Sequence, residues 1–187
     1  MRETGCAEGR HGASAVEEKV AAARLLCSRW GDGLRADSKT VQALHDLGNR
    51  AEAVAAHMTA MGLGAFCGLC ASRQGGGCCS LFMAGETDPL QLLMNLLAGV
   101  DIRLLPHDDD SCTFLAGEGC QFLFKPMFCL NYLCHNIRHY ADPCQLRQLE
   151  RLTGLQLQQH YAVERHLQSW LRGNGAYGEG LLANRSR

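Results

Sequence analysis

The stretch SKTVQALHDLGNRAEAVAAHMTAMG, residues 38–62, has the pattern of an amphipathic helix. Ser38 is a favourable cap for a first turn, and Gly62 is a typical residue for a helix end. The apolar residues between them recur at helical spacing, so we expect one face to be buried against a partner. The predicted buried face consists of Val41, Leu44, Ala51, Val54, Ala55, Met58 and Met61.

Similar helical patterns lie on both sides of this stretch. Upstream, Ser14 precedes apolar residues at steps of four and three, which predicts a helix with Val16, Val20, Ala23, Cys27 and Trp30 on its buried face. Downstream, the pairs Asp88-Pro89 and Asp142-Pro143 each predict a helix start with proline at the first helical position, and Lys125-Pro126 predicts a helix through about Tyr140.

The segments between the helices indicate little sheet. Ile102–Leu105 fits a short strand, and the glycines within residues 114–123 favour a small hairpin or an irregular loop. We therefore predict a mainly α fold in which helices flank a loop-rich cysteine centre, with at most a small β-hairpin.

The predicted domain organisation is simple. Residues 1–13 are rich in glycine and polar groups and are expected to form a flexible arm, and residues 173–187 a flexible tail. Residues 14–172 are expected to form a single helical domain that contains a cysteine-rich region at residues 66–135.

Cysteine is the most unusual feature of the composition. Of the eleven cysteines in the chain, eight fall within one window of under seventy residues. Such a density of oxidisable thiols requires a use, which can be disulfides, a metal or thiol redox chemistry. The eight are Cys67, Cys70, Cys78, Cys79, Cys112, Cys120, Cys129 and Cys134.

The remaining sequence favours a metal over structural disulfides. Met1 to Val20 contains no apolar export segment, and the most apolar stretch, Pro89 to Val100, is shorter than the roughly 20 residues that cross a bilayer. We therefore expect a cytoplasmic protein, in which clustered cysteines bind a metal more often than they form disulfides. The net charge of −1, with mixed signs along the chain, argues against nucleic acid and membranes as partners and indicates no particular protein partner.

The cysteine spacing narrows the kind of metal site. Cys67 and Cys70 form a CxxC pair that can grip one ion, whereas only one such pair is present and a zinc ribbon uses two. The side chains of Cys78-Cys79 would diverge in extended backbone, which indicates two nearby metals or a multinuclear cluster.

Two further features of the spacing leave the ligand set open. In a regular helix, Cys129 and Cys134 would point about 140° apart, given roughly 3.6 residues per turn, so they need not serve one centre. His135 and His139, four residues apart, offer an alternative nitrogen pair for zinc. Cys6, Cys27 and Cys144 lie outside the window and are interpreted as bystanders.

The order of these motifs resembles a known family. The run C-x2-C-x7-CC, then C-x-F-L-x4-C, then K-P-x2-C-x4-C is similar to the YkgJ-type cysteine-rich domains, which are described as chelating zinc or iron. The resemblance covers roughly residues 66–134 and implies metal chelation by these cysteines. A bacterial flagellin lysine methylase has a similar cysteine block, which implies methyl transfer as an alternative, although no glycine-rich nucleotide loop follows a strand here.

The sequence therefore predicts a metal-binding protein that chelates iron, as an iron–sulfur cluster, or zinc through the eight cysteines. Iron is favoured because the thiolates exceed the four that one zinc needs. The alternatives are a metal-dependent redox or methyl-transfer enzyme that uses the same centre, and a structural or interaction protein stabilised by zinc.

Overall fold

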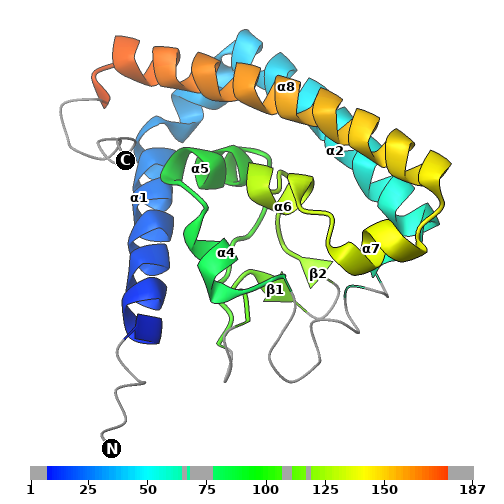
Figure 1. Ribbon diagram of the computed structural model, residues 1–187. Coiled ribbons are helices and arrows are strands. Elements are labelled where there is room, and N and C mark those ends of the chain that lie inside the picture. The colour runs from blue at the N-terminus through cyan, green and yellow to red at the C-terminus, as the bar shows by residue number, and fades with distance from the viewer. Residues whose placement is uncertain (1–7, 65–66, 68–77, 107–110, 117–118, 177–187) are drawn as a thin grey trace, which may run out of the picture.

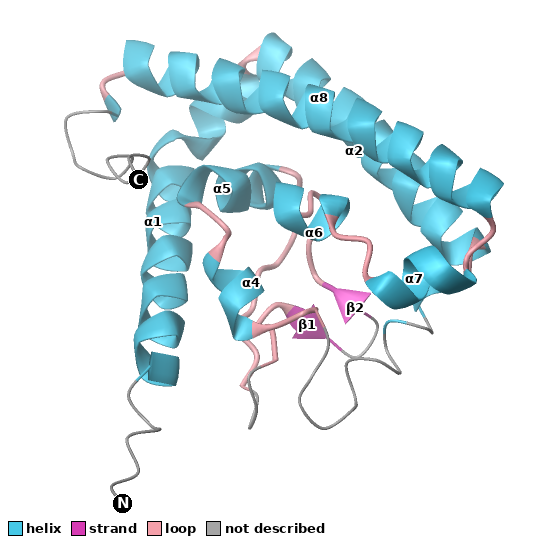
Figure 2. Cartoon of the chain, viewed as in Figure 1, coloured by secondary structure: helices cyan, strands magenta, loops and turns pink. Residues whose placement is uncertain are grey.

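The computed structural model describes residues 8–64, 67, 78–106, 111–116 and 119–176. The chain is mainly helical over these ranges, as predicted, and its sheet is a single two-stranded ladder. Three long helices frame the fold (Figure 1), namely α1 (Glu8–Ala36), α2 (Ser38–Ala60) and α8 (Pro143–Gly173). Short elements lie in the angle between α1 and the α2–α8 pair (Figure 2), namely α4 (Leu81–Gly85), α5 (Pro89–Leu97), β1 (Leu115–Ala116), β2 (Gly119–Cys120), α6 (Met127–Asn131) and α7 (His135–Tyr140).

Helices α2 and α8 lie side by side and antiparallel. The Oγ1 of Thr40, near the start of α2, lies 2.9 Å from Nε2 of His166, near the end of α8. At the other end of the pair, the Nε2 of His57 lies 2.9 Å from the carbonyl oxygen of Gln145. The buried face of α2 differs from the prediction at Val41, which is half exposed, and at Ala55, which is exposed. Its buried residues are Thr40, Leu47, Ala51 and Val54.

The helix α1 packs along α5 through the predicted stripe. Val16, Val20 and Ala23 are buried, and Cys27 and Trp30 are partly buried against the core. The helix begins at Glu8 and not at Ser14, because each residue added to an existing helix costs little free energy. The predicted arm is therefore helical over residues 8–13, whereas residues 1–7 lie outside the described part of the chain.

The predicted caps of α5 and α8 are confirmed. The carboxylates of Asp88 and Asp142 accept backbone N–H bonds from the first turns of α5 and α8, and proline follows each. For α2 the cap is Asp37 in place of Ser38, since its side chain accepts from the backbone N–H of Thr40. The structure also has α4, which is capped by Ser80 and was not predicted.

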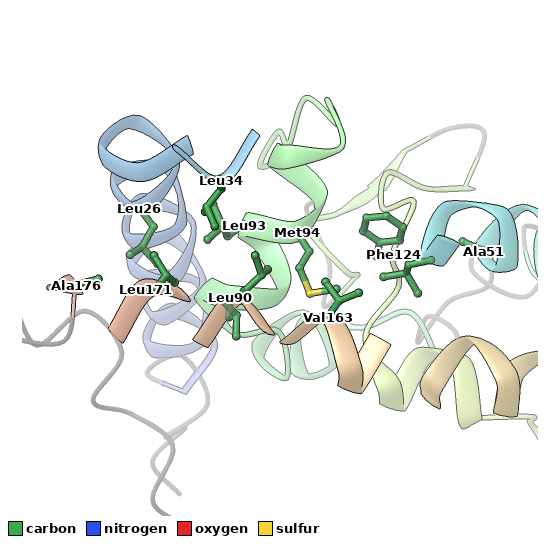
Figure 3. Close-up of a cluster of buried hydrophobic side chains, with 12 residues drawn as sticks. Leu26, Leu34, Ala51, Leu90, Leu93, Met94, Phe124, Val163, Leu171 and Ala176 are labelled. Carbon is green, nitrogen blue, oxygen red and sulfur yellow. The ribbon is translucent and has the colours of Figure 1, made fainter. Parts of the chain in front are cut away.

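The main core lies where α1, α2, α5 and α8 meet. Figure 3 shows Leu26, Leu90, Met94 and Val163 converging there. Ala176, which follows α8, is also buried in this cluster, so the predicted tail packs on the core at its start. Its remaining residues, 177–187, lie outside the described ranges.

The middle of the chain departs most from the predictions. The hairpin is confirmed as β1 and β2, which pair Leu115 with Cys120. The predicted strand at Ile102–Leu105 is wrong, because the amide side chain of Gln121 takes both backbone groups of Arg103 in place of a neighbouring strand.

The predicted helix over residues 125–140 is divided in two. Tyr132 and Cys134 have extended backbone between α6 and α7. Asn131 and Tyr132 are weak helix formers, which fits a break at this point. Over the described residues, the structure has no helix of the length and apolarity needed to span a membrane.

Candidate metal centre

A short antiparallel contact brings two of the predicted ligands together. Ser80 and Ser111 form an isolated bridge, and one step along it the backbone N–H of Cys112 donates to the carbonyl oxygen of Cys79 at 3.1 Å. Residues opposite each other in such a ladder place their side chains on the same face. The contact thus sets the Cys79 and Cys112 thiols on one side of the chain.

The hairpin positions the third thiol. Cys120 lies on β2 opposite Leu115, and the backbone N–H of Gln121 donates to the carbonyl oxygen of Phe114 at 3.1 Å. Phe114 and Phe122 are buried with their ring centroids 4.5 Å apart, and both Cys112 and Cys120 pack against the cluster to which these rings belong. An apolar floor therefore supports this side of the centre.

The fourth thiol comes from α6, which a buried amide network holds in place. The side chain of Asn95 on α5 donates to the carbonyl oxygen of Phe124 and accepts from its backbone N–H, both at 2.9 Å. Two residues later Pro126 caps α6, which carries Cys129. Sequence reasoning missed Asn95, because a single asparagine within a helical pattern gives no signal of a distant backbone partner.

The doublet completes a group of five. The interaction between the two neighbouring thiols raises the pKa of Cys78 and lowers that of Cys79. The two sulfurs are therefore near each other, and Cys78 lies in a bend and not in the extended backbone for which divergence was predicted. We call Cys78, Cys79, Cys112, Cys120 and Cys129 the five-thiol group.

Burial and the charges of neighbouring thiols both act on the pKa values within this group. Burial of the sulfur is the main reason that the pKa of the Cys129 thiol is raised to about 12. Charge repulsion from the neighbouring thiolates of Cys120, Cys112 and Cys78 adds to this shift. Burial likewise raises the pKa of Cys112 and Cys120, whereas the ammonium of Lys125 acts in the opposite direction on Cys120.

The remaining predicted ligands lie elsewhere or outside the described residues. Cys67 and Cys134 pack against a separate apolar cluster that contains Val54, Leu130 and Ile137. Cys134 is thus associated with different neighbours from those of Cys129, which fits the expectation that the two need not serve one centre. Cys70 lies outside the residues that the structure describes.

The two histidines of the alternative pair lie beside each other on α7. The rings of His135 and His139 on α7 stack with centroids 5.8 Å apart and planes 15° from parallel, and both residues are exposed. The ring of His139 also meets that of Tyr140 edge-on at 4.9 Å.

Two of the predicted bystanders have other partners. Cys27 is partly buried against the main core, and its sulfur lies 3.6 Å from the guanidinium of Arg35. Cys144 is exposed at the start of α8, 3.1 Å from the guanidinium of Arg147. Cys6 lies outside the described residues.

In the described part of the chain, no group of three or more Cys, His, Asp or Glu side chains is spaced to hold one metal ion. Comparison with protein-family models, with curated proteins and with solved structures finds no match for this chain. The resemblance to the YkgJ-type domains therefore stays a prediction that rests on the order of the cysteine blocks.

Proposed function

We propose that this protein binds iron, as an iron–sulfur cluster, or zinc through its clustered cysteines. The observation that supports the proposal best is that five of the eight predicted ligands, from separate segments of the chain, lie within range of one another's charge, although no three of them are spaced to hold one ion in the described structure. Their thiols are close enough to shift one another's pKa. Cys67, Cys70 and Cys134 complete the predicted set of eight.

The donor chemistry of the five-thiol group fits a thiophilic metal. Cysteine sulfur is a soft ligand that selects zinc, copper(I) or iron–sulfur clusters over hard cations. Because burial raises the pKa of Cys112, Cys120 and Cys129, these thiols keep their protons in the absence of a counter-charge. A metal cation that displaces the protons would also relieve the repulsion between the thiolates.

We favour iron because five converging thiols exceed the four of a closed zinc site, and thiolates are the usual ligands of iron–sulfur clusters. When bound, such a cluster would supply one-electron transfer, while this chain would supply the ligands, the apolar floor and the Lys125 charge beside Cys120. Zinc would instead connect the loops without redox chemistry.

A second candidate function is a redox enzyme that uses the same centre. The observation that favours it is that Cys78 and Cys129 reach the surface even though their sulfurs are partly buried, so the five-thiol group is not fully enclosed by the described residues. A buried structural site would offer a substrate or redox partner no such access.

The first experiment is metal analysis of protein purified without oxygen. We expect iron and acid-labile sulfide together with broad visible absorption. Colourless protein with stoichiometric zinc would overturn the preference for iron, and protein that neither retains nor takes up a metal would overturn the proposal.

A matched pair of variants tests the ligand set. We expect Cys129→Ser to lose bound metal, because it removes a thiol of the five-thiol group, whereas Cys144→Ser should retain it. Both variants exchange one sulfur for one oxygen at a residue of a helix that reaches the surface, and they differ chiefly in whether the thiol belongs to the five-thiol group. Equal metal loss from both would contradict the assignment.

A further inference from the structure

Among the described members of the five-thiol group, Cys79 and Cys112 lie opposite each other in an antiparallel backbone contact. The bridge between Ser80 and Ser111 is antiparallel, so the next residues along it, Cys79 and Cys112, form the adjacent pair. The 3.1 Å backbone bond from Cys112 to Cys79 fixes this register. In a hydrogen-bonded antiparallel pair the Cα atoms are about 5.5 Å apart, and the side chains leave the ladder on one side.

The Cα separation of such a pair falls within the range of disulfides. Its Cβ atoms are about 4.5–5.5 Å apart, and a disulfide needs about 3.5–4.5 Å, so the bond requires the two segments to move closer by about 1 Å. Unstrained disulfides join residues with Cα atoms about 4.4–6.8 Å apart. The adjacent pair Cys78 and Cys79 does not meet this requirement, because a trans peptide places consecutive Cα atoms about 3.8 Å apart, and the described backbone has no cis peptide bond. The convergence of Cys78 and Cys79 therefore does not make them the preferred disulfide partners.

We propose that Cys79 and Cys112 form a reversible disulfide when the protein is metal-free and an oxidant is present. The bond itself requires only the two thiols. Its consequence rests on the proposed function, since it withdraws two thiolates from the ligand set and so releases the metal. The pair is then a redox-controlled modification site within the metal centre.

The chemistry balances with hydrogen peroxide as the oxidant. One thiolate attacks a peroxide oxygen and breaks the O–O bond, which gives a sulfenic acid and, after protonation of the leaving hydroxide, one water. The second thiolate attacks the sulfenic sulfur, forms the S–S bond and expels hydroxide, which becomes a second water. The two sulfurs together lose two electrons, and peroxide gains them.

The test is peptide mapping of the full chain, stripped of metal and treated with one equivalent of hydrogen peroxide. We expect a non-reduced peptide that joins the segment containing Cys79 to the segment containing Cys112, with fragmentation placing the bond between these two residues. Dithiothreitol should remove it. A dominant bond between any other pair would overturn the proposal.

Variants separate the pair from its neighbours. Cys79→Ser and Cys112→Ser should each abolish the cross-linked peptide, whereas Cys120→Ser, which leaves both proposed partners in place, should retain it. Far-UV circular dichroism checks that each variant is folded, and wild-type mapping stands by itself if one is not. Loss of the cross-link only in Cys120→Ser would contradict the assignment.

The design also separates this proposal from the proposed function. If metal-free protein forms the bond but no metal ever binds, the disulfide stands and the metal function fails. If metal binds with the predicted cysteines but oxidation gives no bond between Cys79 and Cys112, only the disulfide fails. When both hold, metal-loaded protein should form the bond more slowly, and the bond should appear together with metal release.

Discussion

Asp37 is the single residue between α1 and α2, and it joins three elements of the frame. One carboxylate oxygen accepts the backbone N–H of Thr40 at 2.8 Å and its hydroxyl at 2.7 Å, and the same oxygen lies 3.0 Å from Nε2 of His166. The bonds from Thr40 are the main reason that the pKa of Asp37 is lowered, and His166 acts in the same direction. The residue caps α2 and ties it to α8.

The lowered pKa of Asp37 predicts an acid-dependent part of the stability. A carboxyl with a lowered folded-state pKa stabilises the fold above its unfolded value, near 3.8, and this contribution is lost as the pH falls through the lower folded value. We expect Asp37→Asn to lower the thermal midpoint at pH 7. The difference in thermal midpoint between wild type and variant should become smaller as the pH falls below 4. Thermal unfolding followed by circular dichroism measures both.

The control for this prediction is Asp32→Asn. Asp32 is fully exposed, and its carboxylate lies 3.5 Å from the guanidinium of Arg35, so removing its charge should leave the midpoint nearly unchanged. A difference between wild type and Asp37→Asn that stayed constant across the acid range would contradict the role of the charge.

At the scale of elements, sequence predicts what local chemistry determines. The caps Asp88-Pro89 and Asp142-Pro143 and the periodicity of the helices they open are properties of neighbouring residues, and these helices were predicted correctly. The pairing of Cys79 with Cys112 depends on two segments distant in the chain, so spacing identified the residues but not their partners. The strand predicted at Ile102–Leu105 is absent for the same reason. The side chain of Gln121, which is distant in the chain, bonds the backbone of Arg103 in place of a neighbouring strand.

Asn95 on α5 connects the packing of this helix to the segment that carries Cys129. Asn95 is fully buried and holds both backbone groups of Phe124, ahead of α6. Replacing it leaves the backbone N–H of Phe124 unpaired, which costs about 1–3 kcal/mol. We expect Asn95→Ala to lower the free energy of unfolding and to weaken metal binding, as measured by urea denaturation and by competition with a chromogenic chelator.

Asn49→Ala is the matched control, because Asn49 is exposed on α2 and only approaches His45 at 3.4 Å. It makes the same change of side chain within a helix. An unchanged metal affinity in Asn95→Ala would show that the segment before α6 does not depend on this amide.

The same substitution should have opposite effects at two helical glycines, Gly33 on α1 and Gly48 on α2, because their surroundings differ. A Cβ on Gly33 would lie 2.9 and 3.1 Å from ring carbons of Trp170, which packs on the main core, whereas a Cβ on Gly48 would meet nothing within 4 Å. We expect Gly48→Ala to stabilise by about 0.5–1 kcal/mol through helix propensity. Gly33→Ala should destabilise, since overpacking costs about 1–3 kcal/mol. Urea denaturation compares the two, and stabilisation by both would contradict a close approach at Gly33.

At the scale of the whole molecule, the main core and the five-thiol group occupy different places. The main core is built from α1, α2, α5 and α8, together with Phe124 and Ala176, and none of the predicted ligands that the structure describes belongs to it. Cys112 and Cys120 pack against the cluster that contains Phe114 and Phe122, and Cys67 and Cys134 pack against the cluster that contains Leu130. A metal at the cysteines would therefore add to a fold that already has a buried core, unlike a zinc finger, which is unfolded without its ion.

This separation predicts how the protein responds to a chelator. A metal that binds only the folded chain stabilises it by RT ln(1 + [L]/Kd), about 2.7 kcal/mol at a free concentration of 100 Kd. We expect chelation to lower the thermal midpoint while the far-UV helical signal at 25 °C stays nearly unchanged, because α1, α2 and α8 keep their own core. Cys129→Ser should show the lower midpoint from the outset and no further change on chelation. If chelation instead removed most of the helical signal, the long helices would depend on the metal centre, and the independence of the main core would be refuted.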